Sequence, residues 1–282
     1  MVNLEIHSAK YRLKDQWKEI TLAEAIEIYK IAKKLPSYWI SLYEEKLKEE
    51  PDQKRIQDLA NKITIEDLEK NLPIIYGEMI MVLSDIPADV LKKVHSGDRR
   101  ALYEQYLSHL VLGLLFWPAY KSQGISSFKH KGTTYYLPTA SKLHGYEKPG
   151  ADLTALEFTE VADLQIAAAH LEEGRFAHAS KIIAILCRPK GEAYDETTCG
   201  NRAEGFMSLT MDKVWEVFFS LLESTVIFQQ HSLLSTLQAE LLALLSGSKS
   251  KPTAGMPALS KSRRRALWGV SKKLKKRTPT TS

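Results

Sequence analysis

Few residues of this sequence have the types and spacing that catalysis or metal binding requires. The two cysteines, Cys187 and Cys199, lie 12 positions apart with no Cys-x-x-Cys pair, so a structural zinc site is not expected. Cys187 follows an apolar run, which predicts a buried residue, whereas Cys199 lies in a polar segment and is expected to be an exposed thiol. Dinucleotide-binding, phosphate-loop, zinc-protease and serine-hydrolase motifs are absent from the sequence. These observations favour a protein that is not an enzyme and that holds no cofactor or metal.

The histidines and the neighbouring acids also lack the arrangement of a catalytic site. His170 and His178 flank a turn, where packing or helix-end roles are more typical than a shared metal. His130 lies between two lysines and is expected to be exposed. Glu44 and Glu45 belong to a charged run, which predicts a solvated helix surface rather than an acid–base pair.

Aromatic side chains are the stronger candidates for a binding role. Trp117, Tyr120, Tyr135 and Tyr136 surround a predicted hairpin, and Trp268 lies near the C-terminus. Tyrosine and tryptophan are enriched at the energetic centres of protein interfaces, so these five residues are the predicted partner-binding residues. An alternative for the first four is a structural role, in which they pack the hairpin against the helices.

The composition is that of an ordinary folded protein. The chain has 282 residues, of which 44% are hydrophobic and 26% charged, which excludes wholesale disorder and a collagen-like or disulfide-dense scaffold. This length corresponds to one large domain or two modest ones. The sequence has no secretory signal pattern and no apolar run of the roughly 18–20 residues that cross a bilayer. We therefore expect no membrane partner, and a location in the cytoplasm.

Charge is distributed unevenly along the chain. Residues 247–282 contain 11 Lys or Arg and no Asp or Glu, whereas residues 1–246 contain 28 basic and 34 acidic residues, a net charge of −6. Such a tail attracts polyanions or acidic protein surfaces. Nucleic-acid contact, docking on a partner protein and an unstructured solubilising tail all remain open. The predicted nucleic-acid-binding residues are Arg263, Arg264, Arg265, Lys272, Lys273, Lys275, Lys276 and Arg277.

The hydrophobic pattern predicts an α+β fold that is predominantly α-helical, with one small β-hairpin and a flexible basic C-terminal tail. Thr21 and Glu24 have the spacing of a capping box, which satisfies free amides at the start of a helix. A second helix is expected from Thr64 until it ends before Pro73. Residues 101–117 predict a strongly apolar helix. These elements form a predicted N-terminal helical region, residues 1–120.

The middle of the chain predicts the hairpin and further helices over residues 121–246. Strand-forming residues flank Lys131-Gly132, a turn signal, within residues 128–138. Thr154 and Glu157 form a second candidate capping box. Residues 191–200 are expected to form a polar loop, and residues 211–245 have the longest helical pattern. Residues 247–282 form the predicted tail.

Six stretches of the sequence contain strand, hairpin and capped-helix motifs rather than catalytic ones: residues 11–22, 128–138, 153–160, 182–189, 192–195 and 211–219. With these stretches the chain resembles tail-assembly and accessory proteins of tailed bacteriophages and prophages, particularly those of Bacteroidetes hosts. The likeness covers about two thirds of the chain.

This resemblance implies a non-enzymatic protein of bacteriophage tail or virion assembly. The implied partner is a phage structural protein, namely the long helical tape-measure protein, which a chaperone would shield before the tail polymerises. The implied location is the host cell cytoplasm or the virion. The alternative is a nucleic-acid-associated or virion-resident protein that binds DNA through its basic tail.

Overall fold

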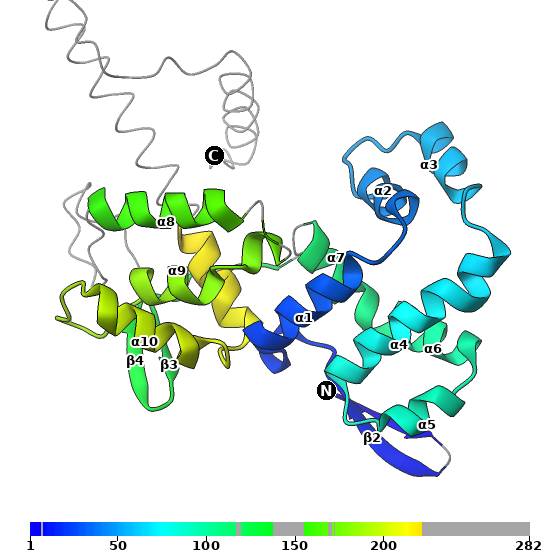
Figure 1. The fold of residues 1–282 in the computed structure, drawn as a ribbon, viewed down its shortest axis with the longest axis horizontal. Coiled ribbons are helices and arrows are strands. Elements are labelled where there is room, and N and C mark those ends of the chain that lie inside the picture. Colours follow the sequence, from blue (N-terminus) through cyan, green and yellow to red (C-terminus); the bar gives the residue numbers. More distant parts are fainter. Residues whose placement is uncertain (7, 117–119, 138–154, 169–170, 172, 222–282) are drawn as a thin grey trace, which may run out of the picture. The chain divides into compact units, whose positions relative to one another are not determined.

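The computed structural model describes residues 1–6, 8–116, 120–137, 155–168, 171 and 173–221, all within the compact unit Met1–Gln229. Helices dominate these residues, and two small antiparallel hairpins accompany them (Figure 1). The predicted class, α+β and mostly helical, is confirmed. The predicted tail, residues 247–282, lies outside the described residues.

The elements of the first half are β1 (Val2–Ile6), β2 (Ala9–Leu13), α1 (Leu22–Ala32), α2 (Ser37–Lys46), α3 (Gln53–Ala60), α4 (Leu72–Leu83), α5 (Ala88–Lys93), α6 (Ser96–Leu102) and α7 (Ser108–Leu115). A 3-10 turn covers Trp17–Glu19, and π-helical turns cover Asp67–Asn71 and Tyr103–Leu107. The second half contains β3 (Ser127–His130), β4 (Thr133–Tyr136), α8 (Ala155–Ala168), a 3-10 turn (Gly174–Phe176), α9 (Ala179–Leu186), α10 (Glu196–Phe206) and a helical segment over residues 211–221.

The predicted hairpin is confirmed in β3 and β4. Ser127 pairs with Tyr136 and His130 with Thr133, so the turn consists of Lys131 and Gly132. Both turn residues have positive φ, 47° and 82°, which is the backbone of a type I′ turn and suits the right-handed twist of the two strands. A second hairpin, β1–β2, was not predicted, because its turn lacks the Gly or Asn that signals one in sequence.

The capping box that opens α1 is also confirmed. Thr21 Oγ1 accepts a hydrogen bond from the Glu24 amide at 3.3 Å, and Glu24 Oε2 accepts one from the Thr21 amide at 2.9 Å. Two amides that have no partner within the helix are thereby satisfied. In the second candidate box Thr154 lies outside the described residues.

Pro73 does not end a helix, contrary to the prediction. The π-helical turn Asp67–Asn71 leads directly into α4, and Pro73 is its second residue. In a regular α-helix the proline ring would clash with the carbonyl four residues earlier. The wider π turn, in which the Leu72 amide donates to the Asp67 carbonyl, accommodates the ring, so the helix continues.

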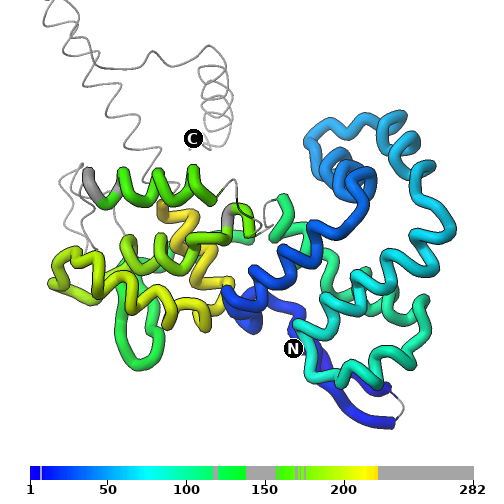
Figure 2. Tube along the Cα trace, viewed as in Figure 1, coloured from blue at the N-terminus to red at the C-terminus, as the bar shows by residue number. Residues whose placement is uncertain are grey.

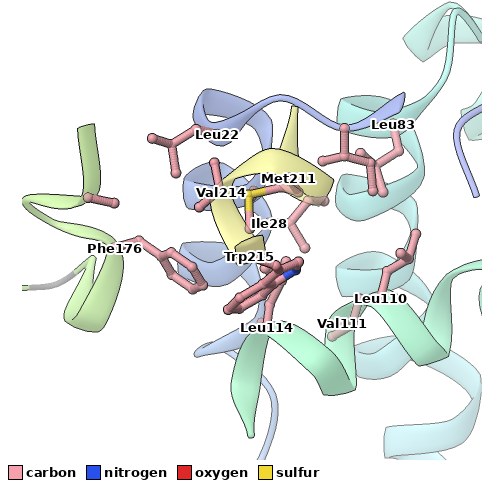
Figure 3. Close-up of a cluster of buried hydrophobic side chains, with 14 of the residues drawn as sticks. Leu22, Ile28, Leu83, Leu110, Val111, Leu114, Phe176, Met211, Val214 and Trp215 are labelled. Atoms are coloured by element: carbon pink, nitrogen blue, oxygen red, sulfur yellow. The ribbon is translucent and has the colours of Figure 1, made fainter. Parts of the chain in front are cut away.

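One hydrophobic core joins early and late segments of the chain. The Met211 amide donates to the Ile20 carbonyl and the Leu22 amide to the Leu209 carbonyl, both at 2.8 Å. Figure 2 shows the blue N-terminal trace adjoining the yellow trace at this point. Trp215, 1% exposed, lies in the core among side chains of α1, α7 and the turn containing Phe176 (Figure 3).

Candidate functional site

Tyr120, a predicted partner-binding residue, is held against the helical segment 211–221. Its hydroxyl donates to Glu216 Oε1 at 2.8 Å, and its ring stacks on Phe219 with 6.0 Å between centroids. Glu216, 3% exposed, also accepts from the Ser122 hydroxyl and the Gln123 amide at 3.0 and 2.6 Å. Burial alone raises the pKa of Glu216, but these hydrogen bonds outweigh it and lower the pKa. The carboxylate therefore anchors the segment that precedes β3.

Tyr135 belongs to an aromatic cluster between the β3–β4 hairpin and α10. Its ring lies 5.7 Å from Phe128 and 5.0 Å from Phe206, centroid to centroid. The Arg202 guanidinium lies 5.4 Å from the Tyr135 ring centre and also pairs with Glu192. These contacts attach the hairpin to α10, which is the packing role that the sequence left open for this tyrosine.

Among the described residues, the contact that places Tyr136 is made by its backbone. Its amide donates to the Arg188 carbonyl at 3.0 Å, so the hairpin also bonds to the chain just after α9. The side chain is half-buried. The structure thus brings Tyr135 and Tyr136 together on one strand and places Tyr120 against a different element. Binding of a partner by these tyrosines stays a prediction.

The remaining predicted binding residues lie outside the described residues. They are Trp117, Trp268, Arg263, Arg264, Arg265, Lys272, Lys273, Lys275, Lys276 and Arg277.

Two side chains predicted to be exposed are not. Cys199 is 1% exposed, and its thiol lies 3.4 Å from the Ala184 carbonyl oxygen, because the predicted loop 191–200 contains the start of α10. Burial raises the pKa of this thiol, which makes it a poor nucleophile. His130 is half-buried, with its ring 5.6 Å from Phe206 and its Nε2 3.0 Å from the Gly205 carbonyl oxygen.

Glu45 is likewise buried rather than solvated, although its neighbour Glu44 is exposed as predicted. Its carboxylate lies 2.6 Å from Lys48 Nζ and 3.2 Å from Arg55 Nε, and it accepts a bond from the Asp52 amide. The hydrogen bond from Lys48 is the main cause that lowers the pKa of Glu45. This group connects α2 to the start of α3.

Hydrogen bonds to Asp67 connect α2 to the π-helical turn before α4. Its carboxylate accepts hydrogen bonds from the Tyr38 hydroxyl at 2.6 Å, from the Thr64 hydroxyl and amide at 2.7 and 2.9 Å, and from the Asn71 amide group at 3.1 Å. The bond from Tyr38 contributes most to holding the pKa of Asp67 far below its usual range. All four donors favour the ionised carboxylate.

The low pKa of Asp67 predicts a pH-dependent contribution to stability. An unfolded Asp has a pKa of about 3.9, so the contribution is complete above about pH 5 and is lost as pH falls toward the folded pKa. We expect Asp67→Asn to destabilise the protein at pH 7, and the loss to shrink between about pH 5 and pH 3. Urea unfolding followed by circular dichroism measures it, with the exposed Asp58→Asn as control. If Asp67→Asn lowered the free energy of unfolding by the same amount at every pH, the ionised carboxylate would not be the source of the stability.

A surface strip on α4 was not predicted. The strip consists of Ile74, Glu78 and Met81, which share one helix face at spacings of four and three residues. Ile74 is 56% and Met81 40% exposed, whereas most other residues of α4 are buried against α1, α5 and α6. Glu78 pairs with Lys34, which follows the end of α1, at 2.7 Å. The sequence signal was the spacing of two helical turns between Ile74 and Met81, with Glu78 between them on the same face of an otherwise apolar segment.

Metal binding and membrane crossing find no support in the described residues. No group of three or more His, Cys, Asp or Glu in that part of the chain could hold a metal ion. Among its helices, none has the length and apolar character that a bilayer crossing requires. Comparison of the chain with protein-family models, with curated proteins and with solved structures found no match.

Proposed function

We propose that this protein is a non-enzymatic factor of bacteriophage tail or virion assembly that acts by protein–protein contact. Its partner would be a long helical structural protein of the tape-measure kind, which it shields from premature association. The resemblance of the stretches quoted above suggests this class. The observation that carries the contact itself is the α4 strip.

The α4 strip suits a helical partner for a physical reason. Large apolar side chains of a helix usually pack against neighbouring elements, yet Ile74 and Met81 remain exposed on α4 on either side of Glu78. Their separation of seven residues equals two helical turns, or about 10 Å. An amphipathic helix offers apolar side chains at the same spacing, so it can pack along the strip. Shielding would then be steric, because the covered stripe cannot meet another copy of the partner.

The net charge of residues 1–246 indicates what charge the partner should carry. Residues 1–246 carry a net charge of −6, which favours a partner with basic residues flanking its apolar stripe. The basic residues of 247–282 support the second candidate, DNA binding, because they would neutralise phosphates. The two candidates differ in which part of the chain the partner needs.

We predict that the double variant Ile74→Gln, Met81→Gln loses the partner while its fold is retained. Each side chain contributes about 1.5–3 kcal/mol when it is fully buried, so losing two partly exposed ones should weaken binding about 10- to 100-fold. Surface substitutions of this kind change folding stability by less than about 0.5 kcal/mol. The measurement is a pull-down from phage-producing cells with mass spectrometry, using the full chain and a chain ending at Ser246.

The matched control is Ile166→Gln, which removes an equally large apolar side chain, 65% exposed, from α8. A long helical partner should survive nuclease, bind the chain ending at Ser246 and be retained by this control. A partner that disappears with nuclease, or with residues 247–282, would instead assign the function to nucleic-acid binding. If the double variant and the control retained the partner equally, the α4 strip would not be the surface that binds it.

A further inference from the structure

Strand β1 has one edge that no other described segment pairs with. On the other side of the hairpin, the Arg12 amide donates to Asp85 Oδ1 at 2.6 Å and the Arg12 carbonyl accepts from the Asp85 amide at 3.2 Å. The backbone of Arg12 therefore points away from β1. In an antiparallel pair of strands, two residues that face each other without exchanging hydrogen bonds both direct their amide and carbonyl groups outward. Asn3 faces Arg12 in this way, so the amide and carbonyl of Asn3 point to the free edge of β1. Glu5, two residues later, does the same.

Among the features that usually prevent strand addition, this edge has a single charged side chain, Glu5, and lacks three others. β1 is regularly paired over five residues and contains no proline, lysine or bulge. The far edge of β2 differs, because residues 83–85 cover it at Arg12, Leu13 and Lys14. In Figure 1 the hairpin lies beside α5, at the end of α4.

We propose that β1 is a dimerisation edge, and that its occupant is β1 of a second copy of this chain. The strands would run antiparallel about a two-fold axis at Leu4. Asn3 then lies opposite Glu5 of the second copy, and Glu5 opposite its Asn3. The amides and carbonyls of these residues, which point outward, form four hydrogen bonds across the axis.

The side chains explain why this register and this occupant fit. Asn3 and Glu5 are exposed on the same face of β1. With Leu4 at the axis, each Glu5 carboxylate faces an Asn3 amide that can donate to it, and no like charges meet. A register that places Glu5 opposite Glu5 would set two carboxylates against each other, which destabilises a strand pair. The sequence Asn3-Leu4-Glu5 is thus complementary to itself.

The proposed assembly also stops at two copies. Two copies give the strand order β2–β1–β1–β2, and residues 83–85 cover the far edge of each β2 over residues 12–14. A two-fold interface uses the same surface of both copies and leaves no free β1 edge for a third copy. The product is a dimer rather than a fibre.

Proline scanning of the cross-strand pair Glu5–Lys10 tests the proposal directly. The mass of the full chain, without an N-terminal tag, would be measured by sedimentation from about 1 μM to about 1 mM, the range of weak dimers. We expect the mass to rise with concentration from that of the 31.9 kDa chain toward twice that value. Glu5→Pro should remain a monomer, because its amide points to the dimer edge. Lys10→Pro is the matched control: it lies in the same pair but points its amide to the other edge, and it should dimerise.

A charge exchange tests the register. Asn3→Glu places a carboxylate beside Arg12 of its own chain but opposite Glu5 of the second copy. The dimer should become about 10-fold weaker while the thermal midpoint of the monomer does not fall. Adding Glu5→Lys should restore the dimer, since the new carboxylate at position 3 then faces the new ammonium group at position 5 of the second copy. A chain that is monomeric at all concentrations, or a dimer that survives Glu5→Pro, would overturn the proposal.

Discussion

Replacing Glu157 with alanine is expected to lower the free energy of unfolding by about 3–5 kcal/mol, a large part of the 5–15 kcal/mol of an ordinary domain. The Glu157 carboxylate lies 2.7 Å from the Arg188 guanidinium, and the two side chains are 0% and 6% exposed. Alanine would take this carboxylate away from a guanidinium that stays buried. Breaking one side of a buried pair costs more than the pair itself contributes, because the remaining charge stays out of water and no longer has this ion-pair partner.

The control for this prediction replaces both charges with apolar side chains, Glu157→Leu and Arg188→Met. Desolvation of the two ions no longer opposes folding in this variant, so most of the lost stability should return. Urea unfolding curves of the natural chain, of Glu157→Ala and of the double variant give the three free energies of unfolding that this comparison needs. A loss below about 1 kcal/mol for Glu157→Ala would mean that water reaches the pair, since surface pairs contribute no more than this.

Local rules of sequence predicted the elements whose structure is determined by neighbouring residues. Thr21 and Glu24 form their box from side chains three positions apart, and Lys131-Gly132 forms a turn whose φ values follow from the residue types. Predictions failed where distant segments decide the outcome. Cys199 lies in a polar stretch, yet Asp195 caps a helix there, and packing of α10 on α9 buries the thiol. No pattern of neighbouring residues in the sequence predicts the packing of α10 on α9.

The candidate site shows the same division. The pattern of apolar residues on α4 indicates a buried helix, but it cannot say which side remains open. The open side follows from the placement of α1, α5 and α6, and the Lys34–Glu78 pair at its margin joins residues 44 positions apart. The unpaired edge of β1 has a similar origin: the strand is short and regular, and the bonds from residues 83–85, a distant segment, to β2 reveal which way the amides of the hairpin point.

Trp215→Ala should be the second most destabilising substitution considered, with an expected loss of about 3–5 kcal/mol. Trp215 is 1% exposed, and its ring packs edge-on against Trp17 and Phe176 with centroids 5.7 and 5.9 Å apart. Alanine would leave a cavity lined by side chains from three separate parts of the chain. Hydrogen bonds between the backbones of residues 20–22 and 209–211 limit how far these parts can collapse into it.

The matched control is Phe218→Ala, three residues further along the same helical segment. Its ring also contacts Trp215, at 6.2 Å, but the side chain is only half-buried, so its removal exposes less apolar area to a void. We expect the loss to be less than half of that for Trp215→Ala, as measured by urea unfolding. Hydrogen bonds between residues 20–22 and 209–211 still join the two segments, so the variant should unfold in one transition at a lower urea concentration. Two separated transitions would show that these hydrogen bonds do not suffice, and that the Trp215 ring is what couples residues 17–22 to residues 211–221.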